Sequence, residues 1–140
     1  MPKLEVMDKK KGMNTITTEG VKITVTTYFR ADLSQVNESR FFFNYRIEME
    51  NMNENPVQLI HRDWYIFDSL NEANTVSGQG VVGEQPILKQ GQIYSYTSGC
   101  ELTSELGRMR GFYTFKNQIT GEMLQILIPT FDLIYPFKLN

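Results

Sequence analysis

The sequence predicts an all-β protein, an antiparallel β-sandwich of about seven strands. Apolar and polar residues alternate with a period of two in several segments, most clearly over Arg40–Asn51. Segments rich in Asn, Gly and Pro separate these runs, as turns do between antiparallel strands. No segment has a convincing helical period of apolar residues.

The chain has 140 residues and an ordinary globular composition, with 41% hydrophobic and 21% charged residues. This length predicts one domain, which we place at residues 15–140. Residues 1–14 have few periodic apolar positions and contain the Lys9–Lys11 run, so we expect a flexible N-terminal lead-in. Three lysines and a net charge of −2 do not favour nucleic acid or anionic lipid as a partner.

The first half of the domain is expected to contain three strands. Thr15–Arg30 reads as one strand with a kink or bulge at Gly20, and residues 31–38 read as a hairpin loop. Arg40–Asn51 has one buried face, made of Phe41, Phe43, Tyr45, Ile47 and Met49.

The third strand, Val57–Asp68, changes the parity of its apolar positions along its length. A β-bulge near His61–Asp63 would restore one core face and turn Trp64 inward.

The second half is expected to contain shorter strands and more loop. Thr75–Val82 and Ile93–Ser98 read as strands, and residues 99–107 read as loop. Arg108–Lys116 and Glu122–Ile128 read as a hairpin that ends or bends at Pro129. The apolar tail Phe131–Phe137 is expected to pack back on the domain.

The segment Gly78–Pro86 opens a glycine-rich region, because seven of the ten glycines lie between Gly78 and Gly111. Gly78, Gly80 and Gly83 form a G-x-G-x-x-G spacing, which in dinucleotide-binding folds opens a helix whose N-terminus holds a pyrophosphate. Here no amphipathic helix follows, so turns, bulges and close backbone contacts are the favoured roles. Exposed N–H groups in this loop could still bind an anion.

No catalytic or metal-binding set is apparent. His61, the only histidine, lies near Asp63, but no activated nucleophile accompanies the pair. One histidine and the distant Cys100 are too few for a zinc site, and Cys100 is expected to be an inert thiol. Oxygen ligands have no fixed spacing, so a carboxylate site for Mg²⁺ stays open.

Cys100 is the single cysteine, so no intramolecular disulfide can form. The N-terminal region lacks a signal-peptide pattern, and no segment approaches the ~20 apolar residues of a membrane span. We therefore expect a cytoplasmic protein without a membrane span.

Several motifs taken together resemble the ApaG domain family, over roughly Thr15 to Asn140. They include G-x-G-V-V-G-x-Q-P over Gly78–Pro86 and R-x-W-x-I-x-D over Arg62–Asp68. The others are Tyr96–Gly99, Gly107–Tyr113 and Ile128–Leu133. Lys89-Gln90-Gly91 departs from the family's usual proline before the glycine, which affects only a turn.

The resemblance implies a fibronectin type III-like or immunoglobulin-like sandwich and no known catalytic centre or cofactor. It implies a non-enzymatic protein-interaction module, with an indirect association with cobalt and magnesium resistance or efflux. We expect an unidentified protein to bind around Gly78, Gly80, Gly83, Gln85 and Pro86. The alternative is a small-ligand protein that binds a divalent cation or a phosphate-bearing anion at the Gly78–Gly83 loop. The oligomeric state is left open by the sequence, and a homodimer is compatible with it.

Overall fold

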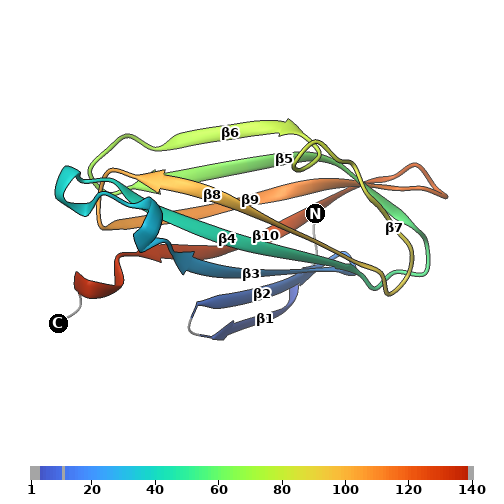
Figure 1. The fold of residues 1–140 in the computed structure, drawn as a ribbon. Coiled ribbons are helices and arrows are strands. Elements are labelled where there is room, and N and C mark those ends of the chain that lie inside the picture. Colours follow the sequence, from blue (N-terminus) through green and yellow to red (C-terminus); the bar gives the residue numbers. More distant parts are fainter. Residues whose placement is uncertain (1–3, 11, 139–140) are drawn as a thin grey trace.

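A computed structural model describes residues 4–10 and 12–138, and it consists almost entirely of strands in two antiparallel sheets (Figure 1). One sheet has the order β1-β2-β3-β4-β8, and the other has β10-β9-β5-β6 with β7 also paired to β5. The predicted all-β class with an antiparallel sandwich is therefore confirmed.

The first sheet contains β1 (Leu4–Lys10), β2 (Met13–Thr18), β3 (Val21–Phe29), β4 (Phe41–Asn51) and β8 (Ile93–Leu102). The second contains β5 (Val57–Asp68), β6 (Asn74–Gln79), β7 (Ile87–Leu88), β9 (Leu106–Asn117) and β10 (Met123–Ile134). Three short 3₁₀ turns complete the structure: η1 (Ala31–Leu33), η2 (Val36–Glu38) and η3 (Pro136–Lys138).

Alternation along β4 and β5 builds the core between the sheets. The five β4 residues predicted to share the inner face are all buried. In β5 the register against β9 shifts between Leu59 and His61, and Trp64 beyond it is only 3% exposed. The predicted bulge and the inward tryptophan are thus both present.

Two local predictions differ from the structure. The expected strand over Thr15–Arg30 is a hairpin, because Glu19 and Gly20 both have positive φ and form a two-residue turn between β2 and β3. The expected loop over residues 99–107 is mostly strand, since β8 runs to Leu102 and β9 starts at Leu106. The expected lead-in covers residues 1–14, of which residues 1–3 and 11 lie outside the described residues. In the described part β1 pairs with β2, and the flexibility of the lead-in stays a prediction.

β10 continues through Pro129 with a shift of register between Ile128 and Phe131. β10 also contacts β2 and β3, and within the bulge the Thr130 carbonyl accepts a hydrogen bond from Asn14 Nδ2 at 2.9 Å. The tail packs back as predicted, with the Tyr135 ring 5.2 Å from Phe29 and 5.3 Å from Phe41. The contacts of β10 with β2 and β3 therefore close one side of the sandwich.

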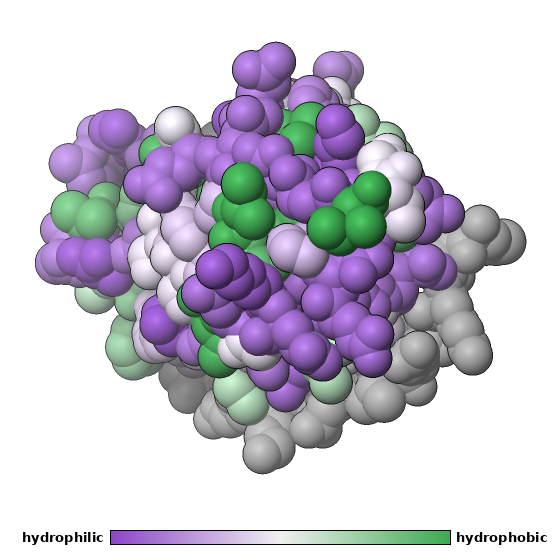
Figure 2. Space-filling view, turned by 90° about the vertical axis from the view of Figure 1, so that its right-hand side faces the viewer, coloured by the Kyte–Doolittle hydropathy of each residue, from purple (hydrophilic) through white to green (hydrophobic). Residues whose placement is uncertain are grey.

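The opposite side of the sandwich has two free sheet edges, β6 and β8. At one end, the turns at residues 52–56, 89–92 and 117–122 gather beside β7. Figure 2 shows this end to be mostly hydrophilic, with apolar side chains in separate small groups. The visible surface there carries no single broad apolar patch.

Candidate functional site

The glycine loop, residues 80–86, leads from β6 to β7. Val81 and Glu84 form an isolated antiparallel bridge, with Val81 N donating to Glu84 O and Glu84 N donating to Val81 O. Val82 (φ +42°) and Gly83 (φ +80°) are the two central residues of this tight turn. The two consecutive positive φ values explain why the predicted glycine spacing forms a turn and opens no helix.

Gly78 makes room for an arginine. It lies opposite Arg62 in the β5–β6 ladder, and a Cβ on Gly78 would lie 2.8 Å from Arg62 Nη2. Arg62 Nη1 donates hydrogen bonds to the carbonyls of Gln79 at 2.9 Å and Gly80 at 2.7 Å. The arginine of the predicted R-x-W-x-I-x-D strand thereby holds the start of the glycine loop.

Gly80 is required for both conformation and space. Its φ is +58°, and a Cβ there would collide with the carbonyl of Glu84. Its N–H donates to Ile60 O at 3.0 Å, beside the β5 bulge. The bulge thus supplies the acceptor that fixes the first residue of the loop.

Gln85 and Pro86 fix the other end of the loop to β5. Gln85 Nε2 donates to Ile60 O at 2.9 Å, and Leu59 N donates to Pro86 O at 3.0 Å. The five site residues predicted from the sequence therefore belong to one continuous region at the β5–β6 edge. Within it the N–H groups of Gly80, Val81 and Glu84 already donate to main-chain carbonyls.

A cavity of about 330 Å³ lies under this loop, between the free edges of the two sheets. Arg62 is the only charged residue among its described lining residues. The remaining lining is aromatic, aliphatic or small: Tyr45, Trp64, Ile66, Val76, Val81, Val82, Tyr96, Ser98, Gly99, Cys100 and Met109. One guanidinium thus faces a space lined by both apolar and neutral polar side chains.

The hydroxyl of Tyr96, a residue of the cavity wall, is paired with a buried tyrosine hydroxyl. The Oη atoms of Tyr96 and Tyr113 are 2.5 Å apart, and Tyr113 is fully buried behind Tyr96. Burial raises the pKa of both phenols above the ordinary value, so both keep their protons at neutral pH. Burial, together with the charges of Asp68 and Glu101, raises the pKa of Cys100 to about 11, as expected for an inert thiol.

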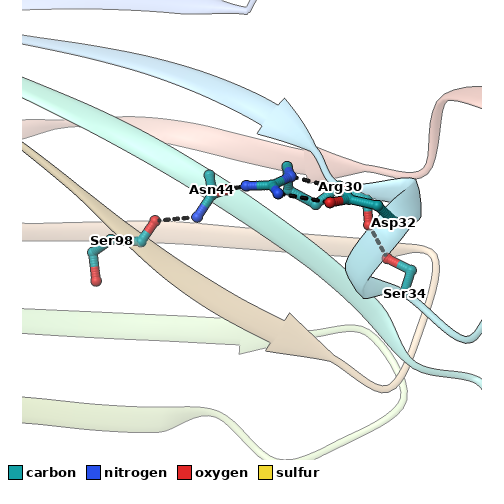
Figure 3. Close-up of polar contacts among 5 residues, drawn as sticks. All are labelled: Arg30, Asp32, Ser34, Asn44 and Ser98. Atoms are coloured by element: carbon teal, nitrogen blue, oxygen red, sulfur yellow. Dashed lines mark hydrogen bonds and ion pairs between the residues drawn. The ribbon is translucent and has the colours of Figure 1, made fainter.

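The β8 wall of the cavity is fixed by a polar network that begins near η1 (Figure 3). Arg30 binds Asp32 through two hydrogen bonds, of 2.9 and 2.7 Å, and also donates to Asn44 Oδ1. Asn44 Nδ2 in turn donates to the Ser98 carbonyl at 3.0 Å. This network ties β8 to β4 at Ser98, which itself lines the cavity.

The His61–Asp63 pair lies beside the loop without forming a hydrolase triad. Asp63 Oδ1 accepts a 2.6 Å hydrogen bond from Ser77 Oγ, and Asp63 Oδ2 lies 3.8 Å from His61 Nε2. The serine therefore contacts the carboxylate, whereas nucleophilic catalysis requires it to contact the imidazole. No group of three or more His, Cys, Asp or Glu that could hold a metal ion occurs among the described residues.

The cavity is not predicted by the sequence patterns, and neither are the roles of Arg62 and Tyr96 in it. These two residues come from different sheets and approach each other only in the folded chain. The sequence holds one hint for Arg62: it lies two residues before Trp64 and beyond the bulge, so its side chain shares the inward face with Trp64. None of the helices that the structure describes is long and apolar enough to cross a membrane.

Comparisons with known proteins agree on one family. The family model described as the ApaG domain matches residues 31–117. Protein ApaG of Methylorubrum extorquens strain PA1 is 44% identical over 119 residues, which are 85% of this chain and 91% of that protein. Protein ApaG of Anaeromyxobacter dehalogenans is 40% identical over 128 residues, which are 91% of this chain and all of that protein.

A solved structure is also similar. The crystal structure of the putative ApaA protein from Bordetella pertussis superposes with a TM-score of 0.80 at 34% identity. The match covers 83% of this chain and 94% of that one. Relatives of this similarity share the fold over nearly their whole length.

Proposed function

Because this chain belongs to the ApaG domain family, we propose that it is a non-enzymatic protein-interaction module. It binds an extended segment of a cytoplasmic partner along the free edge of β6, beside the glycine loop. The family's association with cobalt and magnesium resistance is then indirect and acts through that partner.

The unprotected edge of β6 carries this proposal. Among the strands that the structure describes, β6 pairs only with β5, and all its residues except Gly78 are exposed. Its sequence, NTVSGQ, contains no charged residue and no proline. Sheet edges in monomeric proteins are usually protected by such residues, because an unpaired row of N–H and C=O groups can accept another strand. By contrast, β1, an edge strand of the other sheet, does contain charged residues, namely Asp8, Lys9 and Lys10.

The adjoining loop supports the same mode of binding. Hydrogen bonds from Arg62, Gly80 and Gln85 anchor the end of β6 to β5. A strand edge held in place before binding loses less conformational entropy when a partner pairs with it. Main-chain hydrogen bonds would supply affinity in this mode, with side-chain contacts supplying specificity.

The experiment places proline at two neighbouring positions of β6, in Thr75→Pro and Val76→Pro. Successive residues of an antiparallel edge strand point their N–H groups alternately toward and away from the paired strand. One variant therefore removes a hydrogen bond to β5 and lowers stability, and the other removes only an outward donor. We expect the more stable of the two to lose the partners that the wild-type protein recovers from host cytosol.

Asp132→Asn, at the opposite edge of the same sheet, is the matched control and should recover the wild-type partners. Gly83→Asn tests the turn, where φ is +80° and a Cβ would meet no described atom within 4 Å apart from its chain neighbours. Gly80→Asp cannot serve as a binding test, because the added side chain would collide with the Glu84 carbonyl and disturb the fold. Identical partners for the wild-type protein and the stable proline variant would contradict the proposal.

A small-ligand function at the Gly78–Gly83 loop is the second candidate. Its ligand would be a divalent cation or a phosphate-bearing anion. It has less support, because the N–H groups of Gly80 and Val81, and of Glu84 next to them, already donate to main-chain carbonyls. A thermal melting experiment with Mg²⁺, Co²⁺, ATP and pyrophosphate distinguishes the small-ligand function from the interaction module, because a ligand that binds only the folded state raises Tm. A rise at millimolar ligand would favour this candidate over the interaction module.

A further inference from the structure

We propose that the cavity between β5, β6 and β8 is a binding site for a monocarboxylate with an apolar body, and that Arg62 binds the carboxylate. This inference goes beyond the protein-interaction function and does not depend on it. The cavity is distinct from the outer edge of β6, to which a partner strand would add.

Arg62 has an unused hydrogen-bonding edge. Its Nη1 donates to two main-chain carbonyls, which fixes the orientation of the guanidinium. Among the described residues, Nε and Nη2 have no acceptor, and no carboxylate forms an ion pair with Arg62. The Nε and Nη2 groups form a planar fork that matches the two oxygens of a carboxylate.

Tyr96 supplies a second donor. Tyr113 is fully buried, and Tyr96 Oη is the partner of its hydroxyl. The hydroxyl proton of Tyr113 therefore points to Tyr96 Oη, because an unpaired buried donor is costly. The Tyr96 proton is then left to donate toward the cavity that Tyr96 lines.

The lining of the cavity favours a ligand with a small apolar body and a single negative charge. Ile66, Val76 and Val82 offer accessible apolar surface, and Trp64, Val81 and Met109 lie buried beneath it. No Asp or Glu occurs among the described lining residues. A single guanidinium balances one negative charge, whereas a phosphate monoester brings close to two. The volume of about 330 Å³ is at the small end of ligand pockets, which suits a ligand the size of an aryl acetate.

The rim of the cavity provides a route of entry. Val76 is 38% exposed and Val82 is 60% exposed, and both lie where β6 and the glycine loop meet the cavity. These side chains lie between the cavity and solvent without being packed in the core. A small ligand can enter there without separating the two sheets.

Trp64 allows a direct test, because it is the only tryptophan and lines the cavity. The full chain is titrated with phenylacetate while tryptophan fluorescence is recorded. Phenylacetamide is the neutral isostere, and benzyl phosphate is the dianionic comparison. N-acetyl-Val-Phe and its C-terminal amide distinguish a peptide terminus from a free acid as the source of the carboxylate.

We expect a saturable change with a carboxylate, and binding of the amide at least about tenfold weaker, the usual loss for a charge-assisted pair. Arg62→Lys keeps the charge but not the fork, and Tyr96→Phe removes the second donor. Each should weaken phenylacetate binding by about tenfold. Arg110→Met is the control, since Arg110 lies over the Tyr65 ring outside this cavity, and it should bind as the wild type does.

Equal binding of phenylacetate and phenylacetamide would overturn the proposal. So would unchanged affinity in both Arg62→Lys and Tyr96→Phe, with Tm showing that each variant is folded. Tighter binding of benzyl phosphate than of phenylacetate would contradict the choice of a monocarboxylate. The two proposals are read by different measurements, ligand titration for the cavity and recovery of partners by the β6 proline variants, so each can fail while the other holds.

Discussion

At the scale of single residues, the three glycines of the G-x-G-x-x-G spacing have three different roles. Gly78 leaves space for the Arg62 guanidinium, Gly80 lets the chain pass the Glu84 carbonyl, and Gly83 completes a tight turn. Only Gly80 combines a positive φ with a close backbone neighbour. Substitutions at Gly80 and Gly83 should therefore differ in cost.

Gly80→Ala should lower the free energy of unfolding by about 2–5 kcal/mol, the sum of left-handed strain and steric overpacking. Gly83→Ala should cost only about 1–2 kcal/mol, because beyond its chain neighbours the added Cβ would lie more than 4 Å from every residue that the structure describes. Urea unfolding of both variants measures the difference. Equal costs would show that backbone strain alone decides at these two positions.

At the scale of elements, the end of β5 is attached to the connection between β8 and β9. Asp68, the last residue of β5, accepts hydrogen bonds from Thr103 N at 2.7 Å, Thr103 Oγ1 at 2.8 Å and Ser104 Oγ. Burial alone would raise the pKa of Asp68, but the hydrogen bonds from Ser104 and Thr103 outweigh it and hold the pKa below its ordinary value. The ionised form is thus the one that stabilises the fold.

Asp68→Asn should lower stability at pH 7 by about 1–3 kcal/mol, because the carboxylate and its charge-assisted hydrogen bonds are lost. For a lowered pKa, the stabilisation is complete above the unfolded value of about 3.9 and is lost as pH falls through the folded value. The difference between wild type and variant should therefore shrink below pH 4, as measured by urea unfolding across pH. A constant difference would contradict the role given to the ionised form.

At the scale of the whole molecule, aromatic side chains join the two sheets. Trp64 of β5 lies 5.5 Å from Tyr45 of β4 and 5.9 Å from Phe131 of β10, measured between ring centroids. Tyr45 and Phe131 are 5.8 Å apart, so the three rings contact one another across the interface. Edge-to-face pairs of this kind stabilise a core beyond the area they bury.

Phe131→Ala should destabilise the whole domain by about 3–5 kcal/mol, since Phe131 is only 2% exposed. Tryptophan fluorescence and far-UV circular dichroism should report the same urea midpoint, as expected for one cooperative unit. Separate midpoints for the two signals would show that the sheets come apart before the strands unfold.

Local sequence patterns predicted the structure correctly where the apolar alternation within a single strand determines which side chains are buried. Alternation predicted β4, and the change of parity predicted the bulge and the inward Trp64 in β5. Gly99 read as loop because glycine usually marks a turn, yet in β8 it accommodates the Phe42 ring from the neighbouring strand. Likewise, the cavity depends on contacts among β5, β6 and β8, which no local pattern encodes.

The attachment of β10 to β2 and β3 affects how the protein moves. Contacts of β10 with β2 and β3 close one side of the sandwich, while the β6–β8 side contains a cavity and two free edges. Thermal motions that separate the sheets will therefore pivot about the β10 side and open the β6 side first. Backbone amides in β6 and β8 then exchange with deuterated solvent before those of β3 and β9.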